Sequence, residues 1–445
     1  MGHTSKKRLL MLITNPYAAT NVIHSGLIKR LSYRYELYIM SDIICNKEIT
    51  VINDHFHMHV DLLPLTFPTE NIVIKLLRQI QKAIYFDYFK IETQKIRDLQ
   101  RPWLKARFIT TILYILSSLG LSKVTLQMIR KGIISLTKRI FSNNIHITFD
   151  GIISTSPLDI RENTIVNSLP GIRSLAIIIS WDNLTSKGVI NANHHSVLVW
   201  NQQMAQEYKQ FYQIYNDTAD VFINGSPRFD IYQEPLFGKY MPENFRRTLN
   251  IPAASKVILF TTSAHKHFPN QCDILRHLTD YAALHPSIII LLRFHPADDP
   301  LLYSLFSDLS CIRIWKPEKR FKYIPDLDSL LVLASMLRLC DVCIQVASTI
   351  RLEAAITNTP CISVAYDGNL NLPFSHSVKR FYSFSHQTAF NAYQQDYRVH
   401  SKWELFQTLD SLLDTPQRLR KIRNPQKCIS QANQTTIQYI QKWLN

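Results

Sequence analysis

The sequence predicts an α/β protein with two open-sheet domains and a basic helical insertion in the first domain. Three observations predict this fold. Short apolar runs alternate with helical patterns along most of the 445 residues, as in parallel sheets with crossover helices. A polar, proline-containing stretch at residues 233–255 is typical of an interdomain linker. Positive charge is concentrated in residues 71–144.

The first domain is predicted to span residues 1–232. It begins with an apolar strand, a turn-rich loop and a helix near residues 25–34. The insertion at residues 71–144 then interrupts the series. The predicted strands are residues 8–14, 36–40, 57–63, 151–154, 174–180, 196–200 and 220–224.

The second domain is predicted to span residues 233–428, with helices near residues 270–284, 327–339 and 349–357. Its predicted strands are residues 256–262, 287–293, 311–315, 341–346 and 360–365. The last segment, 429–445, has apolar residues at helical spacing, so we expect a helix that packs back on the first domain.

The charge of the chain indicates an anionic partner. Lys and Arg exceed Asp and Glu by 50 − 34 = 16, and residues 71–144 hold 14 basic against 3 acidic residues. Because aromatic and apolar residues alternate with these charges at helical spacing, we expect residues 71–144 to bind an anionic membrane surface. An ordinary helical insertion with a solvated face and a site for an acidic glycan or lipid-pyrophosphate acceptor are the alternatives. No nucleic-acid partner is expected, since no binding module is recognisable.

Targeting and cysteine patterns favour a cytoplasmic protein, peripheral on the inner face of the cytoplasmic membrane. No signal peptide is expected, and the most hydrophobic stretch, 108–122, is uncharged for 15 residues, short of a membrane span. The seven cysteines are scattered and predicted to be reduced. Cys340 and Cys343 have C-x-x-C spacing without a second pair, so no metal site is expected.

Ten glycines in 445 residues, with no G-x-G-x-x-G, P-loop or G-x-S-x-G, give no support to motif-based dinucleotide binding, NTP hydrolysis or α/β-hydrolase chemistry. The candidate ligand-binding residues are instead the polar residues where predicted strands end, since open parallel sheets bind ligands at the carboxyl ends of their strands.

Three polar groups in the second domain follow predicted strands. Hydroxyl and basic residues after strand 256–262 can cradle and neutralise a phosphate, and an Arg and a His after strand 287–293 can hold a pyrophosphate or sugar hydroxyls. Two hydroxyls at a helix start, followed by a Glu one turn on, suit an anion and a sugar diol. A polar turn, a structural Arg–acid pair and a simple N-cap are the alternative readings. The residues are Ser263, His265, Lys266, Arg293, His295, Ser348, Thr349 and Glu353.

Two groups in the first domain are candidates for acceptor chemistry. Trp181, Asp182 and Asn183 follow predicted strand 174–180, where a carboxylate and an amide could bind an acceptor or act as a base; a capping turn is the alternative. His24 ends the loop after the first strand and could deprotonate an acceptor hydroxyl, although most of the 16 histidines must be incidental. The predicted catalytic residues are thus Asp182, His24 and His295.

Three sequence pieces together resemble the GT-B glycosyltransferases. They are Asn224-Gly-Ser-Pro-Arg-Phe-Asp230, Arg293-Phe-His-Pro296 and the block 341–367, and the likeness extends over about residues 145–370. The chain looks most like the bacterial branch that makes surface and capsular polysaccharides, which includes polyol-phosphate transferases. This resemblance implies two Rossmann-like domains facing across a cleft, with a nucleotide-sugar donor on the second domain and the acceptor on the first.

The resemblance implies a metal-independent enzyme without a cofactor, which transfers a sugar from a nucleotide-sugar to a glycan or lipid-linked acceptor. It assigns Ser263, His265, Arg293, His295 and the 348–353 group to the donor, and Asp182 and Asn183 to the acceptor side. The E-x7-E pattern of many retaining members is absent. The alternatives are a transferase for a CMP-linked acid sugar or glycerol-phosphate, a nucleotide-sugar 2-epimerase, and a non-catalytic glycan- or lipid-binding scaffold.

Overall fold

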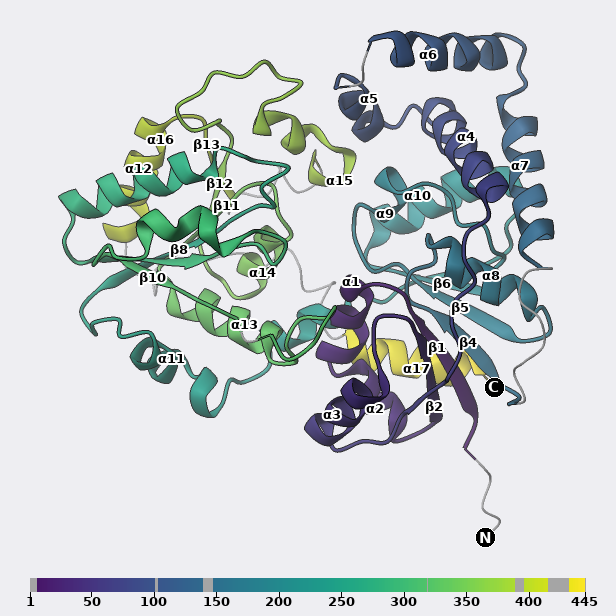
Figure 1. The fold of residues 1–445 in the computed structure, drawn as a ribbon, viewed down its shortest axis with the longest axis horizontal. Coiled ribbons are helices and arrows are strands. Elements are labelled where there is room, and N and C mark those ends of the chain that lie inside the picture. Colours follow the sequence, from purple (N-terminus) through teal and green to yellow (C-terminus); the bar gives the residue numbers. More distant parts are fainter. Residues whose placement is uncertain are drawn as a thin grey trace. The chain divides into compact units, whose positions relative to one another are not determined.

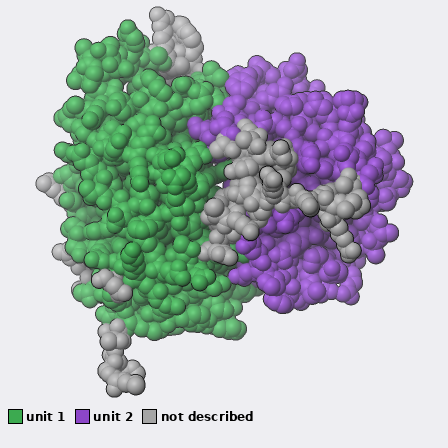
Figure 2. All heavy atoms as spheres, turned by 180° about the vertical axis from the view of Figure 1, so that it is seen from behind, with its two compact units in different colours: residues 1–230, 319–327, 428–445 green, residues 231–318, 328–427 purple. Residues whose placement is uncertain are grey.

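The computed structural model describes residues 6–100, 103–138, 147–317, 319–388, 396–414 and 432–444, with 103–108 and 396 as backbone only. The chain forms two compact units, shown as green and purple spheres in Figure 2. Unit 1 contains residues 1–230, 319–327 and 428–445, and unit 2 contains residues 231–318 and 328–427. Residues 319–327, which the sequence analysis assigned to the second domain, therefore belong to unit 1.

Unit 1 is built on a seven-stranded parallel sheet in the order β3-β2-β1-β4-β5-β6-β7 (Figure 1). The first six strands follow the Rossmann order 3-2-1-4-5-6, in which the chain starts in the middle and returns to the strand beside it. The strands are β1 (Arg8–Ile13), β2 (Glu36–Ser41), β3 (Asp61–Leu62), β4 (Gly151–Ser154), β5 (Arg173–Ile177), β6 (Ser196–Val199) and β7 (Asp220–Ile223).

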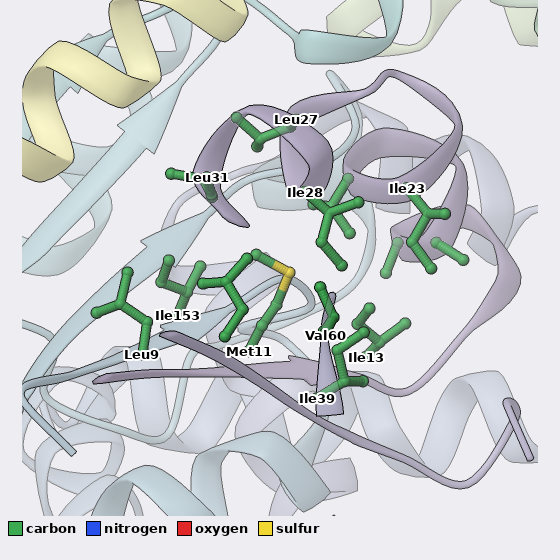
Figure 3. Packing of buried hydrophobic residues seen from close by; sticks show 14 of the residues in the cluster. Leu9, Met11, Ile13, Ile23, Leu27, Ile28, Leu31, Ile39, Val60 and Ile153 are labelled. Atoms are coloured by element: carbon green, nitrogen blue, oxygen red, sulfur yellow. The ribbon is translucent and has the colours of Figure 1, made fainter. Parts of the chain in front are cut away.

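The core of unit 1 lies on both faces of this sheet. Leu9, Met11 and Ile13 of β1 point into one cluster, and Leu10 and Leu12 into another (Figure 3 shows the first). This alternation explains why a parallel strand reads as a continuous apolar run. The covering elements are α1 (Pro16–Ala19), the π-helical turn η1 (Thr20–His24), α2 (Leu27–Ser32), α3 (Asn46–Phe56), α8 (Ile160–Ser168), α9 (Asn183–Ser186), α10 (Gln202–Tyr212), η2 (Gln213–Tyr215) and η3 (Pro227–Tyr232).

The expected insertion is helical. It contains α4 (Ile72–Tyr88), α5 (Glu92–Asp98), α6 (Trp103–Ser118) and α7 (Ser122–Thr137), with α6 at its outer end (Figure 1). No single helix in the described residues is long and apolar enough to cross a membrane, although 109–118 and 122–137, bent by 110°, pass that test together.

Two distant segments complete unit 1. Helix α17 (Ala432–Leu444) packs Ile440 and Trp443 into the core beside β1. Gly151 permits this approach, because a Cβ there would lie 2.8 Å from the Trp443 ring. Residues 319–327 add Phe321, Ile324 and Leu327 to the same cluster.

The Asn224–Asp230 piece of the sequence anchors α17. Asp230 accepts hydrogen bonds from the backbone N–H groups of Ala432 and Asn433, at 2.9 and 2.8 Å. The Ser226 hydroxyl donates to Asn21 at 3.0 Å. These contacts give this segment a structural role in unit 1.

Unit 2 repeats the same topology with a six-stranded sheet in the order β10-β9-β8-β11-β12-β13. The described strand pairs are all parallel. The strands are β8 (Lys256–Thr261), β9 (Ile288–Arg293), β10 (Ile312–Ile314), β11 (Val342–Gln345), β12 (Cys361–Val364) and β13 (Asp396–Val399). The helices are η4 (Gly238–Tyr240), α11 (Pro242–Thr248), α12 (Gln271–Leu284), η5 (Pro300–Phe306), α13 (Ser329–Leu339), α14 (Ile350–Ile356), η6 (Val378–Ser383), α15 (Ser385–Thr388) and α16 (Lys402–Asp414).

The α/β prediction with two Rossmann-like domains is confirmed, with local differences. Only Asp61–Leu62 of predicted strand 57–63 pairs in the sheet. The predicted linker contains α11, whose Phe245 is buried, and the Ser335 hydroxyl of α13 donates to the Tyr240 carbonyl at 2.8 Å. This stretch is therefore part of unit 2. Strand β13 and helices α3, α8, α10, α11 and α16 are not among the elements predicted individually from the sequence.

Candidate functional site

The polar groups predicted on the second domain lie at one edge of the unit 2 sheet. Strand β8 pairs with β9 on one side and with β11 on the other, with Thr261 opposite Arg293 and Phe260 opposite Ile344. The loops that follow these three parallel strands therefore start at the same carboxyl edge. The strand order reverses between β8 and β11, since the strands after β8 are added first on one side of it and then on the other, and open α/β sheets bind ligands at such a point.

Asp298, which the sequence analysis missed, holds two of these loops together. Its carboxylate is buried and accepts four hydrogen bonds. The His265 backbone N–H donates to Oδ1 at 2.7 Å. The Thr262 hydroxyl, the Gln271 amide and the Tyr303 hydroxyl donate to Oδ2 at 3.2, 3.1 and 2.7 Å. Burial raises the pKa of Tyr303, so its hydroxyl stays protonated as a donor.

The side chains that Asp298 leaves outward are mainly basic. His265 and Lys266 are exposed, and Arg293 is partly exposed. His295 is held by its backbone N–H, which donates to the Thr262 hydroxyl at 2.8 Å, and its Nδ1 accepts from the Ala297 N–H at 3.1 Å. Burial, with Arg293 and Lys266 nearby, lowers the pKa of His295, so this imidazole is neutral near pH 7. The edge can thus offer cations to a phosphate and a neutral imidazole to a sugar hydroxyl.

The turn after β11 is tightly held. Ala347 has a left-handed backbone with φ of +43°, a strained conformation for a residue with a Cβ. Its N–H donates to the Tyr382 hydroxyl at 3.1 Å, and its carbonyl accepts from Gln387 at 2.7 Å. The surrounding contacts therefore offset this strain.

The expected open anion cradle at Ser348 and Thr349 is reduced in this structure. The Ser348 N–H donates to the Gln345 side chain at 2.7 Å, and the Ile350 N–H donates to the Ser348 hydroxyl at 3.3 Å. Glu353 is fully buried, so its carboxylate does not reach the surface of unit 2. Thr349 stays partly exposed at the edge.

In unit 1, Trp181 and Asp182 lie between β5 and α9, and Asn183 is the first residue of α9. The hydroxyls of Ser180 and Ser186 each donate to the Asp182 carboxylate at 2.6 Å, and Asn183 accepts from the Ser180 N–H at 3.2 Å. These bonds orient the carboxylate.

The insertion helices hold this loop in place. Tyr85 of α4 donates to the Leu184 carbonyl at 3.2 Å, and Arg97 of α5 donates to the Ser186 carbonyl at 3.1 Å. Arg130 of α7 is buried and donates to the carbonyls of Ile190 and Ala192. Arg130 is therefore an anchor and does not belong to the basic surface.

His24 lies in a different setting from the one expected for a base. Only 2% of it is exposed, and its two ring nitrogens lie 3.2 and 2.9 Å from the carbonyl oxygens of Ala19 and Pro325. Burial lowers its pKa. This geometry favours a structural role, in which His24 holds residues 319–327 against η1.

The carboxyl edge of the unit 1 sheet contains a buried carboxyl that the sequence did not reveal. Glu162 of α8 accepts from the hydroxyls of Thr14 and Ser154 at 2.8 and 2.7 Å and from the Ser156 N–H at 2.8 Å. It thus joins the loops after β1 and β4. Burial raises the pKa of Glu162 to about 8.

No group of three or more His, Cys, Asp or Glu side chains in the described residues is arranged to hold a metal ion. Cys340, Cys343 and Cys361 are buried thiols, and Cys428 lies outside the described residues.

No family model matches the chain, and no curated protein matches it. Solved structures do resemble it. The UDP-GlcNAc 2-epimerase of Neisseria meningitidis bound to UDP-GlcNAc is 10% identical, with 98% of this chain and 100% of that chain covered and a TM-score of 0.56. The UDP-GlcNAc 2-epimerase of Methanocaldococcus jannaschii is 11% identical, with 98% of this chain and 99% of that chain covered and a TM-score of 0.54. The glycotransferase of kitacinnamycin is 11% identical, with 99% of this chain and 100% of that chain covered and a TM-score of 0.50. At these identities the likeness shows the fold, and the predicted GT-B fold class is confirmed.

Proposed function

We propose that the chain is a glycosyltransferase that moves a sugar from a nucleotide-sugar to a glycan or lipid-linked acceptor in bacterial surface polysaccharide synthesis. The donor binds at the carboxyl edge of unit 2, and the acceptor binds at the loop 181–183 of unit 1. The enzyme works in the cytoplasm on the inner face of the membrane, without a metal or other cofactor.

The observation that carries this proposal is the edge formed by β8, β9 and β11. There a buried Asp298 fixes the loops, while Lys266 and Arg293 supply positive charge and His265 is exposed beside them. During transfer, the nucleotide part of the donor is the leaving group, and negative charge grows on its phosphate in the transition state. Fixed cations and oriented donors stabilise such a charge most when they need no reorganisation.

The proposed transfer step is a displacement at the anomeric carbon of the donor sugar. The acceptor hydroxyl oxygen bonds to the anomeric carbon, the bond from that carbon to the phosphate oxygen breaks, and the leaving nucleotide takes the electron pair. Asp182 accepts the hydroxyl proton, because two serine hydroxyls orient its carboxylate. The neutral imidazole of His295 hydrogen-bonds the donor.

Nucleotide-sugar 2-epimerisation is the second candidate, favoured by the fold likeness to two such epimerases. The two activities differ in what they consume. An epimerase inverts the C2 centre of the sugar nucleotide without an acceptor, whereas a transferase releases nucleotide only when an acceptor is present. Incubation with UDP-GlcNAc alone, followed by NMR of the sugar ring, separates them: a C2 epimer would overturn the transferase proposal.

The first test is a thermal-shift screen with UDP, CMP, GDP, ADP and their sugar conjugates, with and without EDTA. A ligand that binds only the folded state raises the melting temperature by mass action. We expect one nucleotide class to stabilise the protein equally with and without EDTA. No shift with any nucleotide would favour a non-catalytic scaffold, and a CMP-specific shift would favour transfer of an acid sugar.

His295→Ala tests the donor site directly. We expect acceptor-dependent transfer to fall by at least about a hundredfold, as when an oriented transition-state donor is lost. The control is His285→Ala, at the exposed end of α12. Equal transfer by the two variants would remove His295 from the mechanism.

A further inference from the structure

The outer end of the insertion carries a surface that the fold of unit 1 does not use. Its large apolar side chains are exposed, including Tyr114 and Leu119 at 73% and 64%, and Met128 at 68%. We call this surface the apolar elbow. It contains residues from α6, from the connection 119–121 and from the first turns of α7: Ile112, Tyr114, Ile115, Leu119, Leu121, Val124 and Met128.

The elbow is uncharged, and the charges that flank it have one sign. No Asp or Glu occurs between Asp98 and Asp150, a stretch that holds eight Lys and Arg. On the preceding helices, Asp87 pairs with Lys90 and Glu92 pairs with Lys95, at 3.0 Å each. Lys123, Lys131 and Lys138 are exposed and form no ion pair with any residue that the structure describes. Arg139 lies outside the described residues.

We propose that the apolar elbow inserts into the interface of an anionic lipid bilayer, with Lys123 and Lys131 against the headgroups. Apolar side chains flanked by lysines match a surface whose outer layer is anionic and whose interior is hydrocarbon. Docking of a second copy fits less well, because a symmetric dimer would place the same lysines against each other.

The geometry favours lying in the interface over spanning the bilayer. A helix of 16 residues is about 24 Å long, shorter than the ~30 Å hydrocarbon core. The described part of α6 is followed, across a short break, by α7 at an angle of 110°. Tyr114 is an amphipathic side chain of the kind enriched at the lipid–water boundary.

The proposal deepens the proposed function and rests on it in one respect, since a lipid-linked acceptor would give the docking its purpose. Through Tyr85 and Arg97, the same insertion holds the loop 181–186 at the predicted acceptor site. Membrane docking would thus bring a lipid-linked substrate to the loop that carries Asp182.

The test is co-sedimentation of the full chain with vesicles of phosphatidylcholine alone and of equal parts phosphatidylcholine and phosphatidylglycerol. We expect binding to the anionic vesicles only, weakened by salt. Leu119→Glu and Met128→Glu should each weaken it at least about tenfold, as should the pair Lys123→Glu and Lys131→Glu. The matched controls are Leu305→Glu, 80% exposed on unit 2, and Lys47→Glu, exposed on α3; both should bind as the unchanged chain does.

Two results would overturn the proposal: vesicle binding unchanged by the elbow variants, or elbow variants that change the oligomeric state in sedimentation while no vesicle binding occurs. A second measurement uses Leu119→Trp, whose fluorescence should shift to the blue with anionic vesicles and be quenched by brominated lipid. Fluorescence of this variant that brominated lipid leaves unquenched would place the elbow outside the bilayer. Because these experiments need neither donor nor acceptor, their failure leaves the nucleotide screen to judge the proposed function.

Discussion

The carboxyl edges of the two sheets have the same strand order but present different chemistry. In unit 2, the buried Asp298 carboxylate accepts hydrogen bonds from a backbone N–H and from a hydroxyl, and the side chains of His265 and Lys266 remain exposed. In unit 1, Glu162 takes the hydroxyls of Thr14 and Ser154, which are themselves buried.

The positive charge on the two edges also differs. Arg161, which precedes Glu162 in α8, pairs with Asp159 at 2.7 Å and with Asp42. Lys266 on unit 2 forms no ion pair with a described residue and is exposed. The strand order therefore decides where the loops lie, whereas the hydrogen bonds of the buried acid decide which side chains stay at the surface. This difference supports the proposal that an anionic nucleotide binds at the edge of unit 2.

The largest expected effect comes from removing the Asp298 carboxylate, which holds the loops of unit 2 together. Asp298→Ala leaves four buried or half-buried donors without their acceptor, at about 1–3 kcal/mol each where no water replaces it. We expect the free energy of unfolding of unit 2 to fall by at least about 3 kcal/mol, and nucleotide stabilisation to disappear.

Denaturant unfolding and the thermal-shift screen measure these effects. The neighbouring Asp299→Ala is the matched control, because Asp299 is exposed and its carboxylate accepts from the Leu301 N–H at the surface. If Asp299→Ala matched the loss, Asp298 would have no special role in holding the loops.

The buried Glu162 of unit 1 predicts an effect of pH on the free energy of unfolding, of intermediate size. The pKa of Glu162 is about 8 in the folded state, above the ordinary value of 4.5 in the unfolded chain. The folded state therefore keeps a proton that the unfolded state releases. The stability from this group is full below pH 4.5 and is lost as the pH rises through about 8.

Glu162→Gln should flatten this decline, since an amide does not titrate. Unfolding at several pH values, compared between the variant and the unchanged chain, measures the difference. Glu243→Gln, at an exposed position, is the control. Parallel curves for Glu162→Gln and the unchanged chain would mean that Glu162 is already ionised in the folded state.

The smallest expected effect concerns the closing helix of unit 1. Asp230→Asn removes the negative charge that accepts from the first N–H groups of α17. We expect a loss of about 1 kcal/mol, typical of a helix N-terminal contact, and faster hydrogen exchange in residues 432–444. Asp220→Asn, exposed at the start of β7, should leave exchange in α17 unchanged.

Residues 319–327 illustrate what sequence periodicity does not contain. They lie between β10 and α13 of unit 2, yet Phe321 and Ile324 pack into the core of unit 1. Their apolar character was visible, but their destination depends on a surface formed by residues about 300 positions earlier, such as His24, whose Nε2 meets Pro325.

Local sequence patterns were enough to predict the α/β class, most strands to within one to three residues, the helical insertion and the loops that follow the strands. Parallel strands are buried on both faces, so their apolar runs can be read locally. Tertiary structure alone decided which polar side chains face outward. It buried Glu353, Arg130 and His24. It also placed Asp298 and Glu162 where their carboxyl groups hold the loops at the carboxyl edges of the two sheets. The physical reason is that a buried polar group is stable only where its partners meet it. For Glu162 the partner Thr14 is 148 residues away, a distance over which no local pattern extends.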